Sequence, residues 1–332
     1  MGNPGRNATE VRDETRRTWE DGRGGTAESP LHIPLSGWKD ILRRTKDAVK
    51  EDNVGILAAG VGFYFMLSLF PFAIAGLSLY GLVADPDDVM KLVEQLEGTM
   101  PTYVSELLEE QLGGIAETSG GSLTFGLIGS VLFALWSASK GASALIKAIN
   151  IASTEGETRG FLRLRVMALG LTFGFLVVMV AALLIIAVVP RLLSETPFGT
   201  LVKVLRWPLL AMISLTGLAV LYRYASDRAE PRWRWVNLGS LVATVLWLAG
   251  SGAFSLYANN FGSFNETYGS LSAVIVLLLW LNLTAFVILL GAEINAESEH
   301  QTAQDSTRGP DRPMGQRGAH AADSVGHRFD SA

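Results

Sequence analysis

The sequence contains no cysteine, and its four histidines, His32, His300, His320 and His327, all lie near the two ends of the chain. The lack of cysteine excludes disulfides, thiolate metal sites and a cysteine nucleophile. The position of the histidines excludes a histidine-based site in the central part of the chain. We therefore expect no metal site and no cofactor.

Charge is also scarce, because Asp, Glu, Lys and Arg make up 18% of the chain against the ~25% that is usual in soluble domains. Most of these charges fall in the ends and between long apolar runs. The run 271–292 has no charged residue. At a rise of ~1.5 Å per residue it extends ~33 Å, which is enough to cross the ~30 Å hydrocarbon core of a bilayer. This run predicts a transmembrane helix.

Five further apolar segments come before this run. The six predicted spans are residues 54–84, 123–144, 166–189, 209–222, 236–258 and 271–292. The expected fold class is therefore all-α, a polytopic membrane protein whose membrane domain covers residues 54–297. Between the first two spans, residues 85–121 predict a pair of amphipathic helices on the outer side. That pair is interpreted as a solvated cap, a lid or a dimer contact.

Lysine and arginine set the orientation of the spans, because positively charged loops stay in the cytoplasm. Twelve of these residues flank the spans on one side and four on the other. The first side has Lys39, Arg43, Arg44, Lys46, Lys50, Arg159, Arg163, Arg165, Arg223, Arg228, Arg232 and Arg234, and the second has Lys91, Arg191, Lys203 and Arg206. Both termini are therefore predicted to be cytoplasmic.

The segments that flank the membrane domain are polar. Residues 1–36 and 298–332 have few aliphatic side chains and are predicted to be disordered. Residues 37–53 predict an amphipathic helix whose apolar face includes Trp38, Ile41 and Leu42. We expect this helix to lie on the anionic inner leaflet, or else to be a solvated extension of the first span.

Polar side chains inside a membrane span mark candidate sites, since they are costly there unless they are paired. Glu293, where the last span leaves the inner leaflet, is interpreted either as a proton-exchanging carboxylate or as an ion-pair partner of Lys or Arg on another helix. Asn282 either lines a pathway or joins two helices by a hydrogen bond. Pro71 is expected to kink or break the first span. The candidate substrate or ion pathway comprises Tyr64, Ser68, Pro71, Asn282, Glu293 and Asn295.

A second set of candidates is cationic. Lys140 and Lys147 lie toward the inner end of the second span, and Arg159 lies between the second and third spans. They are interpreted as contacts for lipid phosphate at the inner leaflet, and the alternative for both lysines is simple snorkelling to the headgroups.

Three blocks of sequence carry a family resemblance. Residues 58–71, residues 141–150 followed by Glu157-Thr158-Arg159, and residues 257–297 resemble the YihY/BrkB family of bacterial inner-membrane proteins. The most specific signature is the predicted outer loop that includes Asn259, Phe261, Gly262, Asn265, Tyr268 and Gly269. The chain departs from the family pattern at Leu238-Gly239, where a Pro-Gly pair is usual, and at Asn282, where a Tyr is usual. The resemblance implies a multi-pass protein of the bacterial inner membrane.

Proteins similar to this chain have been labelled ribonuclease BN. The residues argue against that activity, because a nuclease needs a metal held by clustered ligands or a general acid and base that face its RNA. The only dense carboxylate cluster, residues 85–117, is predicted on the outer side and would repel phosphate. We expect that this protein is not an enzyme and that it has no nucleic-acid partner.

The expected function is transport or handling of a substrate across the membrane. The substrate is a lipid or lipid-linked precursor, or else a cation or proton. The alternative is a scaffold that does not transport anything and binds envelope proteins. Membrane lipids are the expected partners, together with envelope proteins or self-association.

Overall fold

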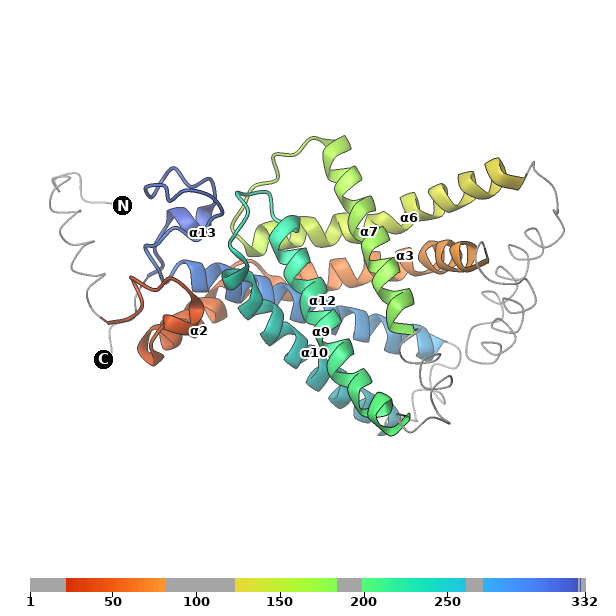
Figure 1. Cartoon of the computed structure of the whole chain (residues 1–332). Helices are drawn as coiled ribbons and strands as arrows, with labels where there is room; N and C mark the ends of the chain where they lie inside the picture. The colour runs from red at the N-terminus through yellow and green to blue at the C-terminus, as the bar shows by residue number, and fades with distance from the viewer. Residues whose placement is uncertain (1–21, 82–122, 184–198, 261–270, 328, 330–332) are drawn as a thin grey trace.

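A computed structural model describes residues 22–81, 123–183, 199–260, 271–327 and 329 (Figure 1). Its helices in chain order are η1 (Pro30–His32), α2 (Leu35–Glu51), α3 (Val54–Gly81), α6 (Leu123–Ala152), α7 (Phe161–Leu183), α9 (Gly199–Ala225), α10 (Trp233–Asn260), α12 (Leu271–Glu299) and α13 (His320–Asp323). Within these residues, helices are the only regular structure besides an isolated antiparallel bridge between Pro231 and Thr307. The predicted all-α class is confirmed.

Within the described residues, each of the six predicted spans overlaps one long helix: α3, α6, α7, α9, α10 or α12. In the part of the chain that the structure describes, four stretches are long and apolar enough to cross a membrane by themselves, namely Phe161–Met179, Pro208–Ala225, Trp233–Tyr257 and Val274–Glu299. A fifth is obtained when α2 and the first part of α3 are taken as one bent span. The polytopic class is confirmed, and the number of six spans stays a prediction.

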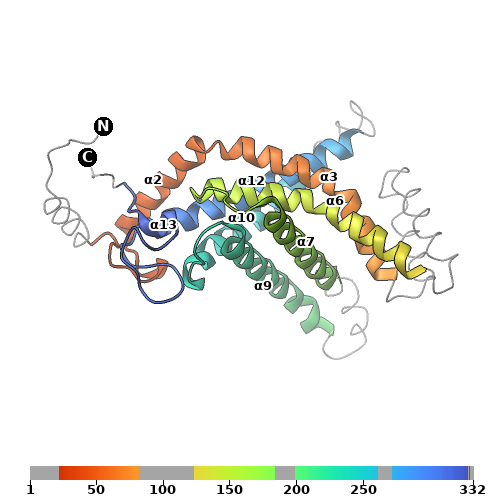
Figure 2. The same cartoon turned by 90° about the horizontal axis from the view of Figure 1, so that it is seen from above.

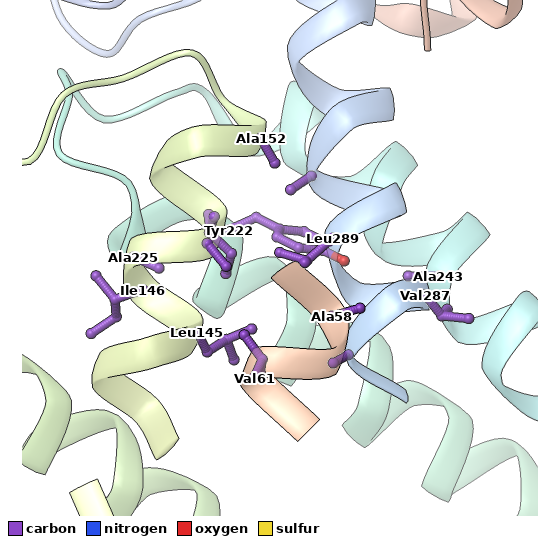
Figure 3. Close-up of a cluster of buried hydrophobic side chains, with 14 of the residues drawn as sticks. Ala58, Val61, Leu145, Ile146, Ala152, Tyr222, Ala225, Ala243, Val287 and Leu289 are labelled. Atoms are coloured by element: carbon purple, nitrogen blue, oxygen red, sulfur yellow. The ribbon is translucent and has the colours of Figure 1, made fainter. Parts of the chain in front are cut away.

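The bundle is built around α3, α6 and α12, which lie side by side (Figures 1 and 2). α10 packs against α12 and α9, and α7 packs against α6 and α9. Their buried side chains form one apolar cluster where α3, α6, α9 and α12 meet (Figure 3). The cluster includes Ala58, Leu145, Ile146, Tyr222 and Leu289. Burial of this cluster positions the ends of these helices relative to one another.

Glycine allows α10 and α12 to touch. A Cβ atom added at Gly239 would overlap the carbonyl oxygen of Gly291 and lie 2.6 Å from the side-chain amide nitrogen of Asn295. Close backbone approach through small residues is typical of helix pairs in membranes. A second approach joins α3 to α12, since a Cβ at Gly62 would lie 3.0 Å from the backbone nitrogen of Asn282.

The sharpest bend in the N-terminal half lies between α2 and α3, whose axes differ by 63°. Asn53, in the break, has a φ of 51°, in the left-handed region that Asn tolerates better than most residues. Pro71, which we expected to kink or break the first span, lies inside the continuous helix α3. The helix therefore does not break at Pro71, and a kink there stays a prediction.

Residues 300–327 pack against the helical bundle, although we expected the segment 298–332 to be disordered. Thr302, Ser306 and Thr307 are buried, and α13 lies at the same end of the bundle as α2 (Figures 1 and 2). Polar contacts replace the missing aliphatic core, because the Arg317 guanidinium donates to the carbonyls of four residues. These are Ala303, Gln304, Arg312 and Ala322. We call this end of the bundle, with residues 22–52, 153–160, 226–232 and 298–327, the capped end.

Part of the N-terminal segment joins the same cap. Residues 1–36 were expected to be disordered, yet Ala27 and Ile33 pack with Ile41 and Trp235 in a small apolar cluster. The C-terminal segment also holds this part of the N-terminal segment in place, because the Thr302 hydroxyl donates a hydrogen bond to the carbonyl of Ala27.

Candidate functional site

The most unusual polar contact at the capped end joins two carboxyl groups. Glu293 lies near the end of α12 and its residue surface is 2% exposed. Its side chain is hydrogen-bonded to that of Asp52, in the break between α2 and α3. Because an ionised carboxylate only accepts hydrogen bonds, a hydrogen bond between the two groups forms when one of them carries a proton. Two carboxyls in one site share a proton in this way because both cannot easily be ionised.

The second oxygen of Glu293 has an unmet hydrogen-bonding capacity. The Oε1 atom is buried and has no hydrogen-bond partner among the residues that the structure describes. An unpartnered buried polar atom is costly in a folded protein and marks a place for a proton, an ion or a water.

An arginine that reaches this part of α12 is bound to another carboxylate. Arg44 of α2 binds Glu297, one turn after Glu293, with its Nε 2.5 Å from Oε2. The same guanidinium donates to the Glu297 carbonyl and to the Gln301 side chain. Nδ1 of His300 lies 3.4 Å from the other Glu297 oxygen. One interpretation of Glu293 was that it forms an ion pair with a lysine or arginine of another helix. Within the described residues, no such ion pair is formed.

The other pathway candidates have separate partners. Asn295 accepts a hydrogen bond from the Gly239 backbone N–H at 2.7 Å and thereby holds α12 to the start of α10. The Ser68 hydroxyl accepts one from the Gly141 N–H of α6. Tyr64 is 44% exposed, Pro71 is half-buried, and the backbone of Asn282 packs against Gly62. Among these candidates the structure places only Glu293 in the carboxyl pair.

Arg159 occupies a different environment from the one expected. Its guanidinium is 4% exposed and binds both oxygens of Glu157, at 2.7 and 2.8 Å, and the Ala225 carbonyl. These hydrogen bonds lower the pKa of the Glu157 carboxyl. Asn150 adds a bond to Glu157 and accepts one from the Asp227 N–H. Arg159 therefore clamps the α6–α7 connection to the α9–α10 connection rather than facing lipid, while Lys140 and Lys147 are exposed on α6.

A further buried ion pair fixes the C-terminal segment. Nη2 of Arg228 lies 2.7 Å from each carboxylate oxygen of Glu299, and both side chains are almost fully buried. The Ser306 hydroxyl donates to the same carboxylate at 2.6 Å. Geometry of this quality is needed to offset the cost of removing both charges from water.

Two residues at or beside the carboxyl pair gave no recognisable signal in the sequence. Asp52 and Arg44 lie in a segment that was treated as an amphipathic surface helix, and their partners are more than 200 positions away in the sequence. The only local signal for Asp52 is its place next to Asn53, directly before an apolar run.

Some predicted features lie outside the described residues. These are the outer helical loop 85–121 and the signature residues Phe261, Gly262, Asn265, Tyr268 and Gly269. Asn259 is in the last turn of α10. In the part of the chain that the structure does describe, no group of three or more His, Asp or Glu side chains is placed to hold a metal ion.

The fold and its apolar helices define a multi-pass, all-α membrane protein. The model of the family described as "Virulence factor BrkB" matches residues 45–315, so the chain belongs to this family. This confirms the resemblance that the sequence carried.

Relatives of the chain are described as membrane proteins or as ribonuclease-like. The putative ribonuclease-like protein YfkH of Bacillus subtilis (strain 168) is 33% identical over 248 residues, which cover 72% of this chain and 88% of that protein. A UPF0761 membrane protein of Verminephrobacter eiseniae (strain EF01-2) is 24% identical over 274 residues, 78% of this chain and 62% of that protein. No solved structure matches the chain.

Proposed function

We propose that this protein transports protons or a small cation across the membrane and that the Asp52–Glu293 pair is the ion-binding site. The observation that carries the proposal is the pair itself, two carboxyls in contact at the end of a membrane helix with a buried, unpartnered oxygen. Ionisable groups of this kind in membrane proteins mark proton and ion pathways.

The chemistry follows from the cost of charge at this place. With one proton the pair carries a single negative charge, and loss of that proton leaves two adjacent carboxylates, one of which is buried. A second proton or a hard cation that binds oxygen ligands relieves this repulsion. Asp52 is partly exposed and Glu293 is buried, so Asp52 supplies the contact with water and Glu293 the inner binding position.

The bend between α2 and α3 gives the site a means of movement. Repulsion between the two ionised carboxylates would push the break at Asp52 away from α12, whereas binding of a proton or cation would draw it back. The Arg44–Glu297 pair holds α2 against α12 one turn further on, so the motion is confined to the break.

We also propose that the capped end faces the cytoplasm of a bacterial inner membrane. Support comes from the excess of Lys and Arg at this end of the spans, which is typical of cytoplasmic loops. Nuclease activity, which belongs to the name of one relative, is not extended to this chain, because the sequence between residues 33 and 299 has neither His nor Cys.

A lipid substrate is the second candidate. An open apolar hollow lies at the start of α7, lined by Phe161, Leu162, Val166 and Met167 with Arg163 among them. Apolar walls beside an exposed guanidinium suit an acyl chain and a phosphate headgroup. Proteoliposomes that scramble a fluorescent lipid, with loss of scrambling in Arg163→Gln, would favour this candidate.

The test of ion transport uses the full chain reconstituted in liposomes with a pH-sensitive dye inside. We expect an imposed proton gradient, or a Na⁺ or K⁺ gradient with a protonophore present, to produce dye-reported flux in the unmodified protein. The flux should be at least ~10-fold lower in Glu293→Gln and Asp52→Asn, which corresponds to a rise of roughly 1.4 kcal/mol or more in the rate-limiting barrier. The matched control is Asp47→Asn, an exposed carboxylate on α2 that should leave flux unchanged. Absence of flux under all three gradients, or equal flux in Glu293→Gln, would overturn the proposal.

A further inference from the structure

The structure divides the apolar face predicted for α2 into two parts. Ile41 and Thr45 are 0% and 5% exposed and pack inside the capped end. Leu42 and Leu35, on a neighbouring face of the helix, are 60% and 82% exposed. These two leucines are seven residues apart and therefore share one helical stripe. The protein itself covers only the first part of the face.

The exposed stripe also carries lysine. Lys39 and Lys46 each follow a leucine by four residues and lie on the same stripe, and both are exposed. Within the described residues, neither lysine forms an ion pair, whereas Arg44 on the buried side of α2 is bound to Glu297. The cations of α2 are thus divided into one that the protein neutralises and others that it leaves available.

The position of α2 places this stripe at a membrane boundary. The helix ends at Glu51, and α3, the first predicted span, begins at Val54. Because the two axes differ by 63°, α2 turns away from the direction of α3 directly before that span begins. A helix at this place runs closer to the membrane plane than to the membrane normal when α3 crosses the bilayer.

We propose that the stripe of Leu35, Lys39, Leu42 and Lys46 docks on anionic lipid headgroups at the membrane surface. The leucines enter the boundary between headgroups and acyl chains, and the lysine ammonium groups reach the lipid phosphates from above, as lysines at interfaces do. Basic segments next to a span are attracted to anionic lipid in this way. The proposal is independent of ion transport at the Asp52–Glu293 pair, and it concerns the face of α2 that does not touch the protein.

The absence of cysteine makes a direct test available, because a single introduced cysteine is the only thiol in the full chain. Leu42→Cys is labelled with an environment-sensitive fluorophore and reconstituted in vesicles of phosphatidylcholine alone or mixed with phosphatidylglycerol. We expect a blue-shifted emission and protection from an aqueous quencher only in the vesicles with phosphatidylglycerol. When Lys39→Gln and Lys46→Gln are added to Leu42→Cys, the label should stay accessible to the quencher in both kinds of vesicle.

The matched control is Asp47→Cys, an exposed position ~140° around the helix from Leu42 at ~100° per residue. Its label should be quenchable in both kinds of vesicle. A Leu42→Cys label that stays quenchable with phosphatidylglycerol overturns the proposal. Equal protection in phosphatidylcholine, or after the lysines are replaced, overturns it too, because the anionic headgroups would then have no role. Unchanged thermal stability of the variants shows that α2 keeps its place on α12.

Discussion

The guanidinium of Arg44 and the carboxylate of Glu297 join α2 to α12 across 253 positions of sequence, with 2.5 Å between Nε and Oε2. This pair lies one helical turn from Glu293. It positions the break at Asp52 against α12, because both partners are mostly buried and each makes further hydrogen bonds. The arrangement of the carboxyl pair therefore depends on an ion pair that does not itself belong to it.

Arg44→Ala should destabilise the protein more than any change to an exposed cation of α2. Removal of one partner leaves the Glu297 carboxylate buried without its cation, which costs about 3 to 5 kcal/mol in such pairs. Thermal unfolding of the protein in detergent measures the effect, with Lys39→Ala as the control, expected within about 0.5 kcal/mol of the unmodified chain. Equal losses of stability in the two variants would contradict the burial of this pair.

Replacing both partners should recover part of the loss. In Arg44→Met/Glu297→Leu no charge is left unpaired, so the double variant is expected to be more stable than Arg44→Ala. A double variant that is no more stable than the single one would show that the other hydrogen bonds of Arg44, to the Gln301 side chain and the His327 carbonyl, carry the contact.

Gly239→Ala should weaken the crossing of α10 and α12. The added methyl group would overlap the Gly291 carbonyl, and the two helices must separate to accept it. We expect a loss of about 1 to 3 kcal/mol, the usual cost of overpacking. Gly252→Ala is the control in the same helix, since no atom lies within 4 Å of its added Cβ. A loss of the same size at Gly252 would point to helix propensity or lipid contact rather than to the crossing.

The contribution of Glu157 to stability should depend on pH in one direction. Because the hydrogen bonds from Arg159 lower the pKa of Glu157 in the folded protein, its ionised form is favoured there. The stabilisation is present above the unfolded pKa of about 4.3 and is lost as the pH falls through the lower, folded value. The difference in melting temperature between the unmodified chain and Glu157→Gln should therefore be largest near neutral pH and shrink under acid. A difference that grows under acid would contradict this sign.

The folded C-terminal segment is testable by cross-linking in this cysteine-free chain. Pro231 and Thr307 form an antiparallel bridge, and residues paired in this way have Cα atoms ~4.5 to 5.5 Å apart, within the range that a disulfide spans. Pro231→Cys/Thr307→Cys should form an intramolecular disulfide on mild oxidation, visible as a mobility shift that a reductant reverses. Each single-cysteine variant serves as a control. Failure of the double variant to close would support a disordered segment.

The sequence by itself determined that this protein folds in a lipid bilayer rather than in water. Uncharged runs long enough to cross a bilayer fix the helices, because the backbone must satisfy its hydrogen bonds internally in lipid. Three blocks of the sequence, around residues 58–71, 141–150 and 257–297, identified the family. Glu293 was found as well, since a carboxylate beside an apolar run stands out locally.

Only the tertiary structure decided the partners. Whether Glu293 faces an arginine, lipid or Asp52 depends on how helices distant in the sequence pack together, and no local pattern records that. The same applies to Arg159, whose charge suggested lipid phosphate but which binds Glu157 and the Ala225 carbonyl. The C-terminal segment is the clearest example. Its composition predicts disorder when hydrophobic burial alone is counted, yet its polar groups find partners on connections that only the assembled bundle brings within reach.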